Sequence, residues 1–137
     1  MADTIRIVNY YYIVGADKPG EGARILKHLD NAGVELAALH AFPSARKTQV
    51  VFVPVSDVAF KAAAKAAKWK VIGPKKAFVV DGEDRTGALV DHFAALGAAN
   101  VNVTAVDAVQ GGAGRFGAIL WVKARDAKRA AKALGVA

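Results

Sequence analysis

Two short turns of this chain carry residue types that could hold a small anion. One spans residues 17–20 and the other residues 84–87, so 84 − 17 = 67 positions separate them. Each turn begins with aspartate, ends with glycine and precedes a stretch that we expect to be helical. The first N–H groups of a helix lack partners and glycine permits close approach, so each turn could seat a carboxylate. The alternative is that Asp17 and Asp84 only cap their helices.

Other reactive residue types are scarce. The sequence has no cysteine, which excludes a disulfide, a thiolate ligand and a cysteine nucleophile. The three histidines, His28, His40 and His92, have no second histidine or carboxylate at the spacing of a metal site. We therefore expect no metal, no cofactor and no catalytic residue.

The net charge of +7 could attract nucleic acid or anionic lipid. Many lysines, however, lie in alanine-rich stretches at helical spacing, as Lys61, Lys65 and Lys68 do, which is typical of a solvent-facing helix. The sequence has no run of about 18 apolar residues and no signal-peptide pattern. We predict a cytoplasmic protein without membrane contact, and we do not expect nucleic acid as its partner.

Apolar patterning predicts the order strand, helix, strand, strand, helix, strand in the first half of the chain. Strands are expected at residues 5–14, 34–42, 49–55 and 69–72, and helices at residues 20–32 and 57–68. Ser56 or Asp57 should cap the second helix. Gly73 and Pro74 should close this unit.

The same order begins again at residue 76. A shift of 67 positions aligns helix starts and breaker residues, and it places Lys61 on Lys128 and Lys65 on Lys132. We predict two tandem copies, residues 1–73 and 74–137, of an α+β, ferredoxin-like βαββαβ sandwich with an antiparallel sheet. The second copy has few residues left for its last strand, so that edge should be open or completed by a partner.

The pattern of an apolar strand, Asp-x-Pro/Thr-Gly, a helix and a second hydrophobic strand resembles the ACT domain, a small amino-acid-sensing module. The resemblance covers essentially the whole chain, as two copies. Residues 84–89 keep the aspartate, glycine and leucine of the family motif, and Asn102 stands where the family has asparagine. The first turn has Gly22 in place of the leucine, and Glu35 stands in place of the asparagine.

The resemblance implies that an amino acid binds between two units, held by the turn and by the start of the second strand. The ligand-binding residues that it implies are Asp17, Lys18, Pro19, Gly20, Glu35, Asp84, Arg85, Thr86, Gly87 and Asn102. The side-chain carbonyl of Asn102 or the carboxylate of Glu35 can accept from an ammonium group. We expect a stand-alone, non-enzymatic regulatory or sensor protein that forms a homodimer and acts through a separate enzyme or regulator.

Two other functions stay open. Residues 115–121, together with Phe78, partly resemble the stacking strands of an RNA-recognition module, although Ala118 stands where an aromatic residue belongs. A small ferredoxin-like enzyme of the dimeric α/β-barrel type is the other alternative. Residues 112–117 match the letters G-x-G-x-x-G, but a strand follows them, which indicates a hairpin loop and not a nucleotide site.

Overall fold

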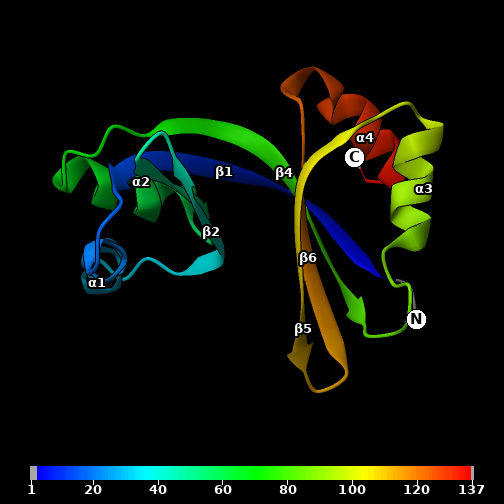
Figure 1. The fold of residues 1–137 in the computed structure, drawn as a ribbon, viewed down its shortest axis with the longest axis horizontal. Coiled ribbons are helices and arrows are strands. Elements are labelled where there is room, and N and C mark those ends of the chain that lie inside the picture. The colour runs from blue at the N-terminus through cyan, green and yellow to red at the C-terminus, as the bar shows by residue number, and fades with distance from the viewer. Residues whose placement is uncertain (1–2, 137) are drawn as a thin grey trace. The chain divides into compact units, whose positions relative to one another are not determined.

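The computed structural model describes residues 3–136, which form an α+β fold of strands and helices (Figure 1). The strands are β1 (Thr4–Ala16), β2 (Leu36–Ser44), β3 (Lys47–Pro54), β4 (Ile72–Glu83), β5 (Val103–Gly112) and β6 (Arg115–Val122). The helices are α1 (Glu21–Asn31), α2 (Asp57–Ala66), α3 (Val90–Ala98) and α4 (Ala127–Leu134), and the short 3₁₀ helix Ala124–Asp126 precedes α4. Within residues 3–136, no helix is long and apolar enough to cross a bilayer.

The chain folds into two compact units that interleave along the sequence. The middle unit comprises Asn9–Lys75, and the end unit comprises the residues up to Val8 together with those from Lys76 onward. The boundary expected between residues 73 and 74 thus lies close to the end of the middle unit, whereas the first residues group with the second half of the chain. The unit boundaries fall inside the long strands β1 and β4, so each of these strands contributes one part to the middle unit and another part to the end unit.

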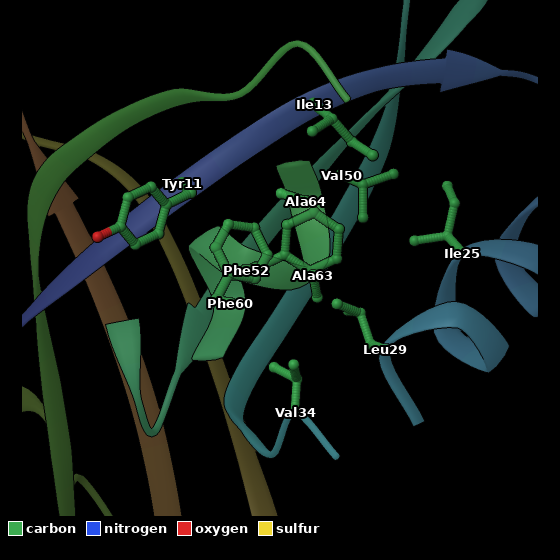
Figure 2. Close-up of a cluster of buried hydrophobic side chains, with 10 residues drawn as sticks. All are labelled: Tyr11, Ile13, Ile25, Leu29, Val34, Val50, Phe52, Phe60, Ala63 and Ala64. Atoms are coloured by element: carbon green, nitrogen blue, oxygen red, sulfur yellow. The ribbon is translucent and has the colours of Figure 1, made fainter. Parts of the chain in front are cut away.

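In the middle unit, the antiparallel strands follow the order β2-β3-β1. Tyr11 of β1 pairs with Phe52 of β3, and both side chains are buried in one cluster with Phe60 of α2 (Figure 2). The rings of Tyr11 and Phe60 are stacked, with their centroids 5.0 Å apart. Ile25 and Leu29 of α1 complete this cluster, because side chains four residues apart share one face of a helix.

The start of α2 is fixed to this core by two neighbouring residues. Ser56 caps the helix, as predicted, and its side-chain oxygen accepts the N–H of Ala59 at 3.2 Å. Asp57, the other expected cap, accepts hydrogen bonds from the side chains of Asn9 and Tyr11, each at 2.7 Å. These bonds tie α2 to β1.

In the end unit, the antiparallel strands follow the order β4-β6-β5, and α3 and α4 lie side by side (Figure 1). Phe78 of β4 pairs with Leu120 of β6, and both are buried. The hairpin between β5 and β6 turns at Ala113 and Gly114, whose φ angles of 53° and 70° are those of a two-residue turn. The hairpin loop predicted for residues 112–117 is therefore confirmed.

The start of the chain supplies the strand that the second half lacks. β1 is the hydrogen-bonded neighbour of β4, and Ile5 and Ile7 pack against the hydrophobic cluster around Phe78. The edge that was expected to be open or covered by a partner is thus completed by the chain itself.

Asp3 fastens this first segment to the end unit. Its side chain is only 2% exposed, and its two carboxylate oxygens accept hydrogen bonds from Arg85 at 3.1 Å each and from His92 Nε2 at 2.7 Å. A Cβ atom on Gly82 would collide with this carboxylate. The hydrogen bond from Arg85 outweighs the effect of burial and holds the pKa of Asp3 below its usual 3.8.

Gly73 and Pro74 lie close to the end of the middle unit at Lys75, as predicted, but no turn closes the unit there. Both residues lie inside β4, and residues 69–71 are not part of a strand. Gly73 has a φ of 131°, and a Cβ atom there would lie 2.7 Å from the backbone oxygen of Tyr10. Close packing against β1, and not a chain reversal, explains this glycine. Trp69 packs against the hydrophobic cluster of the middle unit.

We predict that Asp3→Asn lowers the free energy of unfolding by about 1–2 kcal/mol near neutral pH, because it replaces hydrogen bonds to a charged group by weaker ones. The difference should shrink as the pH falls below about 4. The folded-state pKa of Asp3 lies below 3.8, so its stabilisation is complete above that value and is lost as the carboxylate takes up a proton. Urea unfolding near pH 7 and near pH 3 measures both effects.

Asp81→Asn is the matched control for this substitution. Asp81 also pairs with an arginine, Arg115, at 2.7 Å, but its side chain is 40% exposed. Its loss should therefore cost less than about 0.5 kcal/mol. If Asp3→Asn has the same free energy of unfolding as the wild type at neutral pH, the role that we give to Asp3 is wrong.

Candidate functional site

The turn at residues 84–87 borders a pocket in the end unit. The pocket has a volume of about 360 Å³ and lies between this turn, the start of α3 and the strands β5 and β6. It is lined by Asp84, Gly87, Ala88, Leu89, Val90, Ala108, Val109, Gln110 and Phe116. Binding pockets for small molecules start at about 300 Å³, so the size fits a small metabolite.

Gly87 lets the chain turn into α3. Its φ of +71° is a left-handed conformation that favours glycine. The N–H of Ala88 bonds to the oxygen of Arg85 at 3.2 Å, and the N–H of Val90 bonds to the oxygen of Gly87 at 3.0 Å. Two of the N–H groups at this turn are therefore used within it. In the middle unit, Gly20 has a φ of +87° directly before α1.

The two aspartates do not cap helices, so the alternative considered for them is wrong. The N-cap positions of α1 and α3 are Gly20 and Leu89, and neither helix has a side-chain cap. Asp17 accepts a hydrogen bond from the hydroxyl of Thr48 at 3.4 Å. Asp84 accepts one from the amide of Gln110 on β5. Each aspartate thus joins its turn to a neighbouring strand, and Asp84 places a carboxylate at the pocket.

Arg85 holds the turn together and does not line the pocket. Besides its bonds to Asp3, its guanidinium donates to the backbone oxygens of Glu83 at 2.9 Å and of Ala88 at 3.4 Å. The hydrogen bond to Asp3 raises the pKa of Arg85, which stays charged. Thr86 is exposed in the same turn and is not part of the pocket lining.

In the middle unit, the corresponding turn holds a carboxylate that the sequence analysis missed. Glu21, the first residue of α1, accepts hydrogen bonds from Nε of Arg24 at 2.7 Å and from the N–H of Ala16 at 2.9 Å. The bond from Arg24, followed by that from Ala16, lowers the pKa of Glu21 to about 2. A sequence signal existed, because an acidic residue is favoured in the first turn of a helix.

This carboxylate makes the two turns different. A pocket beside the first turn, lined in part by Asp17, Lys18 and Glu21, has a volume of about 120 Å³. A second pocket that Glu21 also lines, together with Ala16 and Arg24, has a volume of about 290 Å³, but there the carboxylate of Glu21 already bonds to both residues. Pro19 is exposed in that turn. The shift of 67 places Ala88 at the position of Glu21, since 21 + 67 = 88, so the second turn has no equivalent carboxylate.

The structure places Glu35 and Asn102 away from the turns of their own units. Asn102 precedes the first residue of β5, whereas the pocket lining on this strand begins at Ala108, six residues further along the chain or about 20 Å away. Glu35 lies just before the start of β2. The first turn lies near the other end of that strand, because the turn follows Ala16, and Ala16 pairs with Lys47, which also pairs with the last residue of β2. Neither side chain can reach the turn of its own unit.

The aromatic side chains on which the RNA alternative depends are not open for stacking. Phe78 is 1% exposed and Phe116 is 7% exposed, and both belong to the hydrophobic cluster of the end unit. Across residues 3–136, no three histidine or acidic side chains gather as a metal site would require.

No protein-family model matches the sequence, and no curated protein matches it either. Solved structures do resemble it. A protein of Bacteroides thetaiotaomicron has a TM-score of 0.79 at 17% identity, with 96% of this chain and 88% of that chain covered. The ligand-free regulatory subunit of aspartate kinase from Thermus thermophilus has a TM-score of 0.67 at 15% identity, with 98% and 96% covered.

The regulatory subunit of aspartate kinase from Thermus flavus is similar to the same degree, with a TM-score of 0.65 at 16% identity and 98% and 95% covered. At these identities, the likeness shows the fold alone. It supports the ACT-like α+β fold that the sequence indicates, over nearly the whole chain.

Proposed function

We propose that this protein is a non-enzymatic regulatory or sensor protein that binds a free amino acid at the turn formed by residues 84–87. The observation that carries this proposal is the pocket of about 360 Å³ between that turn and β5. The fold of the chain is similar to that of the regulatory subunits of aspartate kinase, which supports a regulatory role.

The lining of the pocket suits an amino acid with an apolar side chain. Ala88, Leu89, Val90 and Val109 supply an apolar wall. Asp84, held by Gln110, supplies a carboxylate that can accept from an ammonium group. We therefore expect valine or leucine to bind better than aspartate or glutamate.

We also propose that the two units are tandem ACT-like repeats, encoded by residues 1–73 and 74–137, with the first residues of the chain exchanged into the end unit. The support is that each unit contains the order strand, helix, strand, strand, helix. The helices α2 and α4 also end alike, because Trp69 bonds to the oxygen of Ala64 at 3.0 Å and Val136 bonds to that of Ala131 at 2.9 Å.

We assign the functional form to a homodimer. Because Asn102 cannot reach the second turn of its own unit, it could contact a ligand there only if it came from a second subunit. A partner enzyme or regulator would then read the occupancy of the pocket. The location in the cytoplasm and the absence of catalysis stay predictions.

The first turn, we infer, does not bind the same ligand. Glu21 already occupies the start of α1 with its own carboxylate, where it bonds to Ala16 and Arg24. A ligand carboxylate there would meet the like charge of Glu21, which has no counterpart at the second turn. In the middle unit, the carboxylate of Glu21 thus takes the place that a ligand carboxylate would occupy.

We predict that valine or leucine at ten times its dissociation constant raises the melting temperature of the wild type by about 5 °C, because a ligand that binds only the folded state stabilises it. Gly87→Val should abolish the shift, since the φ of +71° at this position disfavours a β-branched side chain. Thermal unfolding against a panel of amino acids measures this.

Gly20→Val is the matched control, because Gly20 also has a positive φ but borders the first turn. It should lower the melting temperature and keep the ligand shift. A second variant, Val109→Asp, tests the pocket without backbone strain, since Val109 is 69% exposed and lines the pocket. No shift of the wild type by any amino acid at millimolar concentration would refute the proposed function.

We further predict that Glu21→Gln destabilises the protein near neutral pH, since it removes the charge that Arg24 and Ala16 bind. The folded-state pKa of about 2 lies below the usual 4.5 of this group, so the stabilisation is complete above about pH 4.5 and is lost as the pH falls towards 2. Urea unfolding as a function of pH should show the two proteins converging in that range. Glu35→Gln, at an exposed site, serves as the control.

A further inference from the structure

The end unit contains a second pocket that the proposed function does not use. It has a volume of about 540 Å³ and lies against α4 and the strands β1 and β4. Ile7, Phe78 and Ala127 contribute to its apolar lining. This volume lies within the usual range for a small-molecule site.

The equivalent place in the middle unit is filled. The shift of 67 relates Phe60 to Ala127, since 60 + 67 = 127, and Trp69 to Val136, since 69 + 67 = 136. The matching hydrogen bonds that end α2 and α4 confirm this correspondence in the structure, because Trp69 and Val136 occupy the same position after each helix. Two large aromatic residues of one unit thus correspond to two small residues of the other.

The aromatic residues fill the core of the middle unit by direct ring contact. Phe60 stacks on Tyr11 with ring centroids 5.0 Å apart, and Trp69 stacks on Phe52 with centroids 6.0 Å apart. The end unit has Phe78 at the position of Tyr11 but no ring at residues 127 or 136. Phe78 is buried by its other neighbours, and the pocket lies over Ala127 and Val136, where a bound apolar group would supply contacts.

The charge around this pocket is positive. Lys76, Lys128 and Lys132 line it, and none of the described residues in its lining is acidic. Lys128 and Lys132 are four residues apart on α4, a spacing at which like charges destabilise a helix. In the middle unit an acid, Asp57, stands at the start of α2, whereas the end unit has Ala124 at that position, since 57 + 67 = 124.

We propose that this pocket binds a small carboxylate with an aromatic or alkyl body. The body replaces the rings that Phe60 and Trp69 supply in the other unit, and the carboxylate lies among the three lysines. An amino acid does not fit, because its ammonium group would meet only positive charge. The site is thus separate from the amino-acid pocket at residues 84–87 in place and in ligand chemistry.

The test compares 3-phenylpropionate with phenylalanine, which differs from it only by the added ammonium group. In calorimetric titrations of the full chain, the wild type should bind 3-phenylpropionate at least tenfold more tightly than it binds phenylalanine at this site. Octanoate, titrated in parallel, shows whether an alkyl body is accepted as well. Higher salt should weaken binding, because the lysines lie at the protein surface.

Two variants locate the binding. Ala127→Phe restores the ring of the other unit and should abolish binding of 3-phenylpropionate while the circular dichroism spectrum stays that of the wild type. The double variant Lys128→Gln with Lys132→Gln should weaken binding about tenfold. The matched control is Lys61→Gln with Lys65→Gln, the same change on α2, which should leave affinity unaltered.

The proposal is overturned by absence of binding at millimolar concentration, by equal affinity for phenylalanine at this site, or by undiminished affinity of folded Ala127→Phe. These results are independent of the proposed function, because the thermal shift by valine or leucine depends on Gly87 and not on Ala127. Ligand binding at one pocket can therefore be lost while ligand binding at the other is kept.

Discussion

The buried carboxylate of Asp3 connects the first residues of the chain to the unit built from its last part. Its bonds to Arg85 and His92 hold the beginning of β1 next to β4, where the second half of the sequence has no strand of its own. Arg85 also stabilises the turn at residues 84–87, because its guanidinium donates to the backbone oxygens of Glu83 and Ala88. Completion of the sheet and the shape of the candidate site therefore depend on the same ion pair.

The two turns have similar backbone conformations but differ at one position, which is Glu21 in the first and Ala88 in the second. Both place a glycine with positive φ ahead of a helix, and both tie an aspartate to a neighbouring strand. Glu21 then places a carboxylate at the first turn, bonded to Ala16 and Arg24, whereas Ala88 leaves the second turn without one. A helix start favours a negative charge whether it comes from a side chain or from a ligand.

The helices α2 and α4 show the same division of roles. Phe60 and Trp69 pack the middle unit, and their replacement by small residues leaves the end unit with a pocket beside three lysines. Loss of a buried phenylalanine side chain typically costs about 3–5 kcal/mol, part of which a bound apolar group can offset.

The sequence by itself determined the kind and order of most elements, although the separate strand expected at residues 69–72 is not formed. Alternating and continuous apolar stretches set the strands, and Ser56 set the start of α2, because these are local effects of side-chain period and capping. Tertiary structure decided what depends on distant partners. It placed residues before Asn9 in the end unit, put Gly73 inside β4 against Tyr10, and left Asn102 at the start of β5, away from the pocket lining that begins at Ala108. Strand exchange and close backbone contact join residues far apart in the chain, and no local pattern records them.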